Sequence, residues 1–523
     1  MMAWARLSAL GHQRAGQLVQ PECREVDAYQ EQWLLACLHR NRDTVYGRRY
    51  NFGDISSTRE YQARVPIVEY EDLAGLINVI GAGEADILFA GRPLMFERTS
   101  GSRTRDKLIP YSGSGLFDFQ SAILPWLTQI IDGFRLIQGS AYWAISPVTR
   151  TKEYTPSGIP VGMYDGQYLG EAASTAFAEL SAVPWWVADL EDVKDWKIAT
   201  LYHLLCEPGL RLISVWSPTF LDVLLDGLDE YAPQLHSLLA AGGQVGGHVL
   251  EANVAALQRL QGWEKKQDPR DYRILWPRLR LVSCWGDATS AGWYRKLAAR
   301  FPQSAFQRKG LLATEGVITV PNCSGDPALC MHSGFYEFLD GERRALIAGE
   351  LRVGNSYEVI LTTASGLYRY RIGDLVHCDH AAHGAEPPIL RFIGRTGVSS
   401  DLIGEKLTEA FVSQCLSDVE GFAILVPLVA DHARPAYRLL LDERLAENHN
   451  LILERVEQRL CGNPYYAYAR RIGQLGELEA CYVHSPLELY MAWAKRSAAR
   501  LGDIKVQSLR PEPEFASYMG VGI

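Results

Sequence analysis

Two strands joined by a tight turn are predicted by residues 357–376, YEVILTTASGLYRYRIGDLV. Residues 357–363 are rich in β-branched side chains, which favours a strand, and Ser365-Gly366 interrupts that run as a turn would. Residues 367–372 then resume the strand pattern. We therefore expect a hairpin whose second strand ends beside Asp374.

Asp374 has the chemistry needed to bind a ribose. A carboxylate beside a glycine at a strand end can accept hydrogen bonds from both ribose hydroxyls, as acidic residues do in other nucleotide-binding folds. In the alternative interpretation the strand is purely structural, Arg369 and Arg371 share one exposed face, and Asp374 begins a turn. The residues alone leave both interpretations open.

Helical and strand periods alternate along most of the chain, which is typical of a mixed α and β (α/β) fold. Apolar residues recur at helical spacing over residues 26–38 and predict an amphipathic helix. A chain of 523 residues is too long for one compact core. We therefore expect at least two domains.

The pattern changes beyond residue 395, where it predicts a small α+β domain. The predicted elements are strands at 422–429, 437–441 and 475–484 and a helix at 452–460. Glycines and serines in residues 394–400 suit a hinge. The sequence therefore predicts a large domain, residues 1–396, followed by a small and mobile domain, residues 397–523.

The composition indicates small-molecule chemistry in the cytoplasm. The net charge of −9 and the lack of a long basic block argue against a nucleic-acid partner, since clustered Lys and Arg bind phosphates. No stretch reaches the roughly 18 apolar residues of a membrane helix, and the first residues lack the pattern of a secretory signal. The ten cysteines include no Cys-x-x-Cys pair, which favours a reducing compartment. The oligomeric state is left open.

Three further segments carry groups suited to a nucleotide. Residues 96–110, FERTSGSRTRDKLIP, place hydroxyl side chains and cations around a glycine, an arrangement that can bind phosphate oxygens but is also common in plain loops. Residues 310–316, GLLATEG, and residues 401–409, DLIGEKLTE, add carboxylates and a lysine. The Walker, Gly-x-Ser-x-Gly and Gly-x-Gly-x-x-Gly motifs are absent, which disfavours P-loop enzymes, serine hydrolases and dinucleotide-binding proteins.

A group of possible metal ligands follows Asp374. Its members are His377, Cys378, Asp379, His380 and His383. Adjacent side chains on a strand point to opposite faces, so these residues could not all surround one ion. We expect a polar loop here rather than a zinc site.

Taken together, in this order and spacing, these segments resemble those of the Gretchen Hagen 3 family of acyl-acid amido synthetases, a branch of the luciferase-like adenylate-forming enzymes. Residues 361–374, LTTASGLYRYRIGD, are similar to the most distinctive stretch of that family, and residues 405–409 are similar to its Glu-Lys-x-x-Glu element. The resemblance implies a large N-terminal domain with a β-barrel and two β/α layers, and a small α+β domain on a hinge.

The resemblance also implies a nucleotide site for ATP. The residues that would hold its phosphates are Thr99, Ser100, Gly101 and Ser102. Thr314 and Glu315 would lie beside the α-phosphate, with Glu315 as a ligand of Mg²⁺. Asp374 would bind the ribose, and Arg395 would lie near it at the hinge.

Two lysines would reach this site from the small domain. The resemblance implies that Lys406 approaches the nucleotide, and that Lys505, in a segment similar to the family's Gln-Tyr-Lys element, neutralises charge on the reacting phosphate. The alternative for Lys505 is an exposed surface lysine. With Glu315, these lysines are the candidate catalytic residues.

The implied reaction joins a carboxylic acid to an amine or amino acid in two steps. The carboxylate first attacks the α-phosphorus of ATP and pyrophosphate leaves, and the amine then displaces AMP. Alignment and charge stabilisation suffice, without a protein nucleophile. Two alternatives stay open: a thiol acceptor on coenzyme A or a carrier protein, and a nucleotide-binding homologue without turnover, for which Arg103 in the phosphate loop is the one hint.

Overall fold

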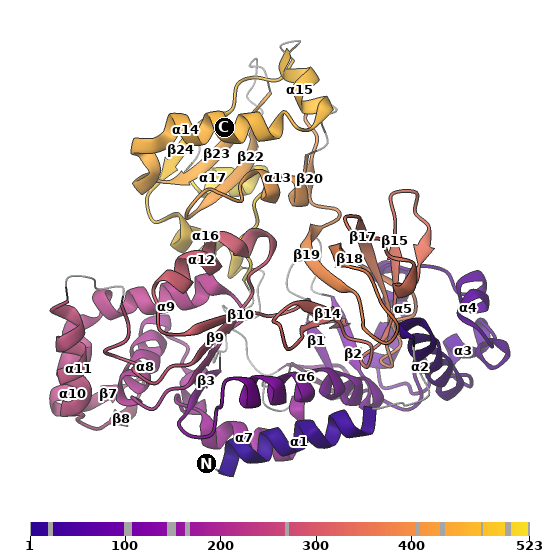
Figure 1. Cartoon of the computed structure of the whole chain (residues 1–523), viewed down its shortest axis with the longest axis horizontal. Coiled ribbons are helices and arrows are strands. Elements are labelled where there is room, and N and C mark those ends of the chain that lie inside the picture. The colour runs from indigo at the N-terminus through magenta and orange to yellow at the C-terminus, as the bar shows by residue number, and fades with distance from the viewer. Residues whose placement is uncertain are drawn as a thin grey trace.

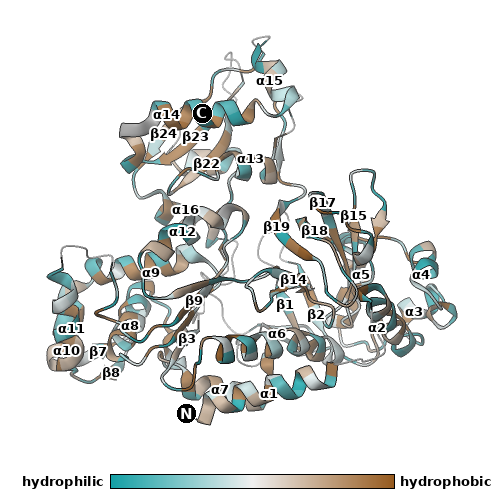
Figure 2. Ribbon diagram, viewed as in Figure 1, coloured by the Kyte–Doolittle hydropathy of each residue, from teal (hydrophilic) through white to brown (hydrophobic). Residues whose placement is uncertain are grey.

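A computed structural model provides the fold. It describes residues 2–18, 25–98, 107–143, 153–162, 168–266, 271–403, 405, 407–428, 435–471, 474–496 and 504–520. Helices and strands alternate through these residues, so the predicted mixed α/β class is confirmed (Figure 1). Figure 2 shows hydrophobic residues along the strands of the sheets, while hydrophilic residues recur along outer helices.

The largest sheet has seven antiparallel strands in the order β13-β14-β19-β18-β17-β15-β16. Their bounds are β13 Thr319–Pro321, β14 Pro327–Leu329, β15 Phe335–Leu339, β16 Ala345–Leu346, β17 Ser356–Thr362, β18 Tyr370–His380 and β19 Ile389–Arg395. Every residue of β17 after Ser356 is buried, so both faces of the sheet centre are covered. The predicted helix over residues 26–38 is α2 (Val26–Arg40), which contacts β15.

The predicted hairpin is present, and its second strand is shifted. β17 and β18 pair antiparallel, but β18 begins at Tyr370 and continues to His380. The connecting turn needs glycine, because Gly366 has a φ of 89° and a Cβ there would lie 2.5 Å from Leu88. The strand extends so far because β19 pairs with it along most of its length.

A second sheet has four parallel strands in the order β10-β9-β6-β3. Their bounds are β3 Ala141–Trp143, β6 Leu212–Ser214, β9 Leu281–Cys284 and β10 Ala305–Arg308. The helices around this part of the chain are α7 Glu171–Leu180, α8 Val193–Cys206, α9 Pro218–Glu230, α10 Ala232–Ala241, α11 Val254–Glu264 and α12 Ala291–Ala299. Helices α8 to α12 contribute to one large core that is separate from the core of the seven-stranded sheet, whereas α7 packs with α1 and α6 in a third core.

Two long helices lie side by side below both sheets in Figure 1, α1 (Met2–Leu18) and α6 (Gly113–Gly133). A small sheet of order β2-β1-β5-β4 precedes and follows α6 in sequence. Its strands are β1 Met95–Arg98, β2 Leu108–Tyr111, β4 Glu153–Tyr154 and β5 Pro160–Val161. Because α6 starts directly after β2, the start of this helix is fixed to the sheet.

The C-terminal part forms a separate lobe at the top of Figure 1. Its elements are α13 Glu409–Cys415, β22 Ala423–Leu428, β23 Ala436–Asp442, α14 His449–Leu460, α15 Pro464–Arg471, β24 Glu479–Val483, α16 Pro486–Ala494 and α17 Pro513–Tyr518. β22 and β23 form the predicted hairpin, and β24 adds to β23 in parallel. The lobe touches the rest of the chain at α12, where Arg295 donates a 2.6 Å hydrogen bond to the Ser417 carbonyl.

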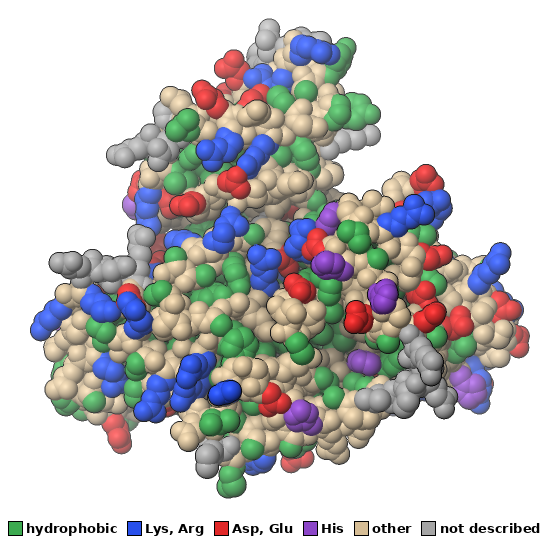
Figure 3. All heavy atoms as spheres, viewed as in Figure 1, with side chains coloured by type: hydrophobic (Ala, Val, Ile, Leu, Met, Phe, Trp, Pro, Cys, Tyr) green, Lys and Arg blue, Asp and Glu red, His purple; other side chains and the backbone are tan. Residues whose placement is uncertain are grey.

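The surface carries charges of both signs. Lys and Arg side chains are interspersed with Asp and Glu over much of the face seen in Figure 3, which is hollowed between the upper lobe and the lobe that contains β17 to β19. Among the described residues, no helix combines the length and the apolar character needed to cross a membrane.

Candidate active site

A two-residue turn presents Thr314 and Glu315. β11 (Leu312–Ala313) and β12 (Gly316–Val317) pair antiparallel, so these two residues form the tip between them. The Tyr111 hydroxyl, at the end of β2, donates a 2.6 Å hydrogen bond to the Thr314 carbonyl. Burial, and the nearby charges of Glu97 and Glu315, raise the pKa of Tyr111, so it stays a hydrogen-bond donor.

Glu315 shares its electrostatic surroundings with groups from three other segments. Burial raises the pKa of Glu315, Arg395 and Lys107 lower it, and the charge of Asp374 raises it further. Burial also raises the pKa of Tyr370, and the charge of Glu315 adds to that shift. The tertiary structure thus brings Glu315, Asp374 and Arg395 near one another, and their roles in nucleotide binding stay predictions.

Asp374 and Arg395 face each other across two paired strands. Asp374 lies directly opposite Arg395 in the register of β18 and β19, and Arg395 Nε is 2.6 Å from Asp374 Oδ1. The Asp374 side chain is 5% exposed, whereas that of Arg395 is 37% exposed. The charge of Asp374 is the main reason that the pKa of Arg395 is raised. The pair therefore joins a buried acceptor to a cation that still reaches solvent.

The predicted position of Asp374 at a strand end is wrong. Asp374 is the fifth residue of the 11-residue strand β18, which stays paired with β19 beyond it. It is β19 that ends at this point, with Arg395. The alternative, in which Asp374 begins a turn, is wrong for the same reason.

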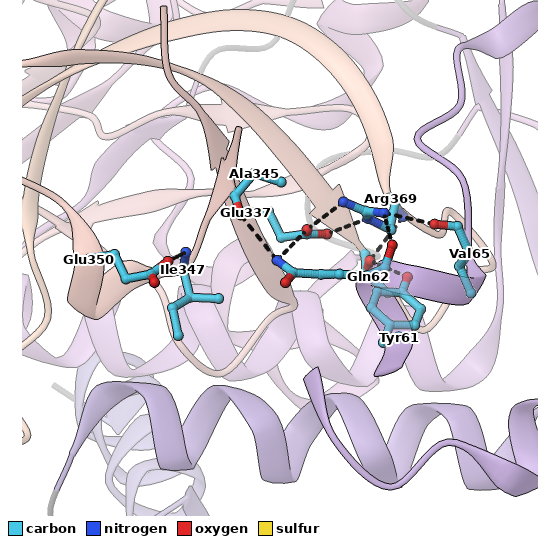
Figure 4. Close-up of polar contacts among 9 residues, drawn as sticks. Tyr61, Gln62, Val65, Glu337, Ala345, Ile347, Glu350 and Arg369 are labelled. Atoms are coloured by element: carbon cyan, nitrogen blue, oxygen red, sulfur yellow. Dashed lines mark hydrogen bonds and ion pairs between the residues drawn. The ribbon is translucent and has the colours of Figure 1, made fainter. Parts of the chain in front are cut away.

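The exposed face that the alternative interpretation assigned to Arg369 and Arg371 is also wrong. Arg369 has a φ of 48°, and its guanidinium donates to both oxygens of Glu337 at 2.9 and 3.0 Å. Figure 4 shows the same guanidinium donating to the backbone carbonyls of Gln62 and Val65. The Arg369 and Glu337 side chains are 7% and 1% exposed. This arginine is a core residue, and only Arg371 lies nearer the surface.

The two glutamates of the Glu-Lys-x-x-Glu element bind backbone. Glu405 accepts hydrogen bonds from the N–H groups of Leu402 and Ile403, at 2.7 and 2.9 Å. Glu409 accepts from the N–H groups of Ser508 and Leu509, at 2.7 and 2.6 Å, and burial raises its pKa to about 7. Sequence reasoning missed this anchoring role, because Glu409 and its partners are about one hundred positions apart.

The anchored segment carries Lys505. The Lys505 ammonium lies 4.1 Å from the centre of the Trp285 ring and 5.8 Å from that of Phe392. Phe392 belongs to β19, the strand that ends at Arg395. Lys505 therefore contacts the part of the chain that carries the candidate site, although its catalytic role stays a prediction.

Five of the predicted site residues lie outside the described residues. They are Thr99, Ser100, Gly101, Ser102 and Lys406. Their described neighbours in sequence include Arg98, at the end of β1, and Lys107, just before β2. Lys107 is one of the cations that act on Glu315.

Four of the five possible metal ligands after Asp374 lie on β18 rather than in the expected loop, and His383 follows the end of that strand. β18 reaches His380, and Cys378 is buried while Asp379 pairs with Arg391 of β19 at 2.9 Å. Buried and less buried residues alternate along the strand, as the sequence argument assumed. Among the described residues, no group of three or more His, Cys, Asp and Glu is placed to hold a metal ion.

This fold is that of the adenylate-forming ligases. A solved 2-hydroxyisobutyryl-CoA ligase in the postadenylation state superimposes with a TM-score of 0.53 at 13% identity, covering 95% of this chain and 93% of the other. The chain belongs to the GH3 family: the GH3 family N-terminal domain matches residues 17–306, and the GH3 family central domain matches residues 328–395. The resemblance found in the motifs is confirmed.

Individual relatives agree with this assignment. The indole-3-acetic acid-amido synthetase GH3.15 of Arabidopsis thaliana is 25% identical over 435 residues, which cover 73% of this chain and 70% of the relative. The solved GH3.15 acyl acid amido synthetase in complex with 2,4-DB has a TM-score of 0.82 at 18% identity, covering 98% of this chain and 96% of that one. The predicted class, a ligase that forms carbon–nitrogen bonds, is the class named for these relatives.

Proposed function

We propose that this protein is an ATP-dependent acyl-acid amido synthetase, which adenylates a carboxylic acid and transfers the acyl group to an amine or amino acid. Membership of the GH3 family supports the reaction class. The main support for the proposed nucleotide site is that Glu315, Asp374 and Arg395 come from separate segments and act on one another electrostatically.

Each residue has a role that its surroundings support. Asp374 is the ribose acceptor, because it is held in place by Arg395 and keeps lone pairs for the two hydroxyls. Arg395, which is partly exposed, offers positive charge to the nucleotide. We assign the phosphates to Thr99, Ser100, Gly101 and Ser102, and we assign Thr314 to the α-phosphate, beside Glu315.

Glu315 fits the expected Mg²⁺ ion. Mg²⁺ is usually bound by one or two carboxylates together with phosphate oxygens and water, and it neutralises charge on the reacting triphosphate when bound. Glu315 supplies one hard oxygen donor at the tip of a turn. Lys107 and Arg395 favour its charged form, which is the form that a metal requires.

Catalysis then rests on alignment and charge. The attacking carboxylate and the triphosphate repel each other, so cations that hold both in line lower the barrier. We assign this role to Lys505 and Lys406, both from the proposed small domain, residues 397–523. Residues 1–396 form the proposed large domain, and rotation about the segment after Arg395 would exchange the lysines between the two half-reactions.

A thiol acceptor remains the second candidate. It is favoured by one observation, the fold shared with a coenzyme A ligase. The first half-reaction is common to both candidates, so only the acceptor separates them. The third possibility, a nucleotide-binding homologue without turnover, predicts no pyrophosphate exchange at all.

We test the proposal with ATP–pyrophosphate exchange across a panel of carboxylic acids. Exchange that depends on both an acid and Mg²⁺ is expected, and removal of the metal with EDTA should abolish it. Release of AMP in the presence of hydroxylamine or amino acids, with formation of the hydroxamate or amide, supports the amido synthetase. Thioester formation without amide would support the second candidate, and silence with every acid would refute an enzyme of this class.

The proposal includes a cytoplasmic location and small-molecule partners, with neither nucleic acid nor membrane. The nine cysteines among the described residues are free thiols, as a reducing compartment would keep them. Fractionation of cells that express the tagged protein would check the location.

A further inference from the structure

A cavity of about 450 Å³ lies away from the candidate active site, among α1, α2 and the start of α6. Its walls include Leu18 of α1, Tyr29, Trp33 and Arg40 of α2, Phe117 and Asp118 of α6, and His332 after β14. Small-ligand sites commonly measure about 300–1,000 Å³ and are lined by aromatic and apolar groups with a few polar ones. The cavity has the size and the lining of a ligand site.

Asp118 lines the cavity and has a carboxylate oxygen without a hydrogen-bond partner among the described residues. The residue is 9% exposed, and this oxygen, Oδ2, is buried. A buried polar atom without a partner costs free energy, and most native structures avoid such atoms. The carboxyl group is therefore prepared for a donor that enters the cavity.

The cavity is distinct from the proposed adenylate site. Tyr111, at the end of β2, contacts the Thr314 turn of the candidate active site. Phe117 and Asp118 lie farther along the chain, within α6, and line the cavity. None of Glu315, Asp374 and Arg395 lines the cavity. A ligand there would bind outside the proposed nucleotide site.

The surrounding groups select the chemistry of the occupant. Phe117 is 46% exposed, although the guanidinium of Arg14 lies 3.9 Å from the centre of its ring. Together with Trp33 and Tyr29, Phe117 offers aromatic surface to the apolar part of a ligand. His332 adds no charge, because burial lowers its pKa to about 4, and its Nδ1 is 2.5 Å from the Tyr29 hydroxyl. Arg40 also lines the cavity; its charge favours the ionised form of Asp118, and its exposure to water weakens its repulsion of a cation.

We propose that this cavity is an accessory binding site for a small primary amine with an apolar or aromatic body, whose ammonium group donates to Asp118. The ammonium supplies the donor that Oδ2 lacks and neutralises the buried carboxylate, while the body covers the rings of Phe117 and Trp33. A carboxylic acid of the same shape would meet the negative charge of ionised Asp118 and should bind less tightly than the amine.

Calorimetry with 2-phenylethylamine tests the site, with 2-phenylethanol as a neutral probe of the same shape. The amine should bind at least about tenfold more tightly than the alcohol, and Asp118→Asn should remove that difference. Asp132→Asn is the matched control on the same helix, because Asp132 binds Ser8 and His12 at the surface, and it should leave binding unchanged. Equal binding of amine and alcohol, or full binding by Asp118→Asn, would overturn the proposal.

Phe117→Ala provides a second variant, which does not alter the buried carboxyl group. Since Phe117 is half exposed, its removal should leave the fold intact and weaken binding of 2-phenylethylamine about three- to tenfold. Unchanged affinity in this variant would also count against the cavity as the binding site.

The pH dependence gives an independent readout. Burial is the main cause that raises the pKa of Asp118 to about 7, against Arg40, Trp33 and Arg14, which lower it. The other titratable or charged groups nearby are Arg14, Tyr29, Cys37, Arg40, Cys330, His332 and Tyr336. Burial keeps both thiols, Tyr336 and His332 uncharged near neutrality. Affinity for the amine should rise about tenfold from pH 6 to pH 8 as Asp118 ionises, and a flat profile would contradict the proposal.

This inference does not depend on the proposed function, and a pair of variants separates the two. Asp118→Asn should lose 2-phenylethylamine and keep AMP, whereas Asp374→Ala should lose AMP and keep 2-phenylethylamine. Loss of amine binding in Asp374→Ala would place the amine in the active site and overturn the accessory site. Retained AMP binding in Asp374→Ala would refute only the assignment of the nucleotide site.

Discussion

Two arginine–carboxylate pairs at the same strand differ in how much of the arginine is exposed to solvent. Arg369, just before β18, is bound by both oxygens of Glu337, with both side chains almost fully buried. Asp374, inside β18, is buried as well, but its partner Arg395 is 37% exposed. The first pair has used its hydrogen-bonding groups on protein, whereas the second leaves a cation and free lone pairs beside the Thr314–Glu315 turn. Identical chemistry thus builds a core in one place and a candidate ligand site in the other.

The buried pair should give the largest effect, and it should be on stability. Glu337→Gln leaves the Arg369 charge buried without its counter-charge, so the free energy of unfolding should fall by about 3–5 kcal/mol. Urea unfolding would measure this loss. The control is the double variant Glu337→Leu with Arg369→Leu, which removes both charges and should recover much of the stability. A single variant as stable as the parent protein would show that the pair is not a core element.

The second pair, in which only the arginine is partly exposed, should instead affect activity. Asp374→Ala removes two charge-assisted hydrogen bonds to the ribose, so kcat/KM for pyrophosphate exchange should fall at least about 100-fold. Unfolding in urea should change little, because Arg395 can turn to solvent. Asp379→Ala is the matched control, since Asp379 pairs with Arg391 across the same two strands and should leave exchange within about twofold. Equal losses of exchange activity in Asp374→Ala and Asp379→Ala would show that the Asp374–Arg395 pair has no special role in activity.

Glu315 should set the acidic limb of the pH profile. Burial raises its pKa above the ordinary value of 4.5, more than Arg395 and Lys107 lower it. Falling pH therefore protonates Glu315, and removes its metal-binding form, at a higher pH than for an exposed glutamate. The logarithm of kcat/KM should begin to decline above pH 4.5, and Glu315→Gln should be slow and lack this limb. The same limb in the variant would assign it to another group.

Lys505 should have the smallest effect of the four. It is one cation among several, so Lys505→Ala should slow the adenylation step about tenfold and leave AMP affinity nearly unchanged. Single-turnover formation of pyrophosphate measures this step. Lys495→Ala, at the end of α16 in the same lobe, is the control and should be neutral. A similar loss in both variants would indicate a general effect of surface charge rather than a role for Lys505.

Local sequence determined the elements that depend on neighbouring residues. The β-branched run of residues 357–363 and the turn at Gly366 predicted the hairpin, because strand propensity and the steric freedom of glycine act within a few residues. The strands and helix of the C-terminal lobe followed from periodicity in the same way. The motifs in their order were also enough to predict the family, which the family match confirms.

Only the tertiary structure decided which charges are buried. The spacing of Arg369 and Arg371 allowed one shared exposed face as an alternative, yet Glu337, more than 30 positions away, binds Arg369 in the core. Asp374 lies inside its strand because β19 extends the pairing, and Glu409 anchors a segment about one hundred positions later. The environment of a charge depends on groups that meet it from distant parts of the chain, because Coulomb interactions and desolvation act through space. The sequence therefore determined which side chains exist and their local form, and the packing of the chain decided which of them became core and which became a candidate site.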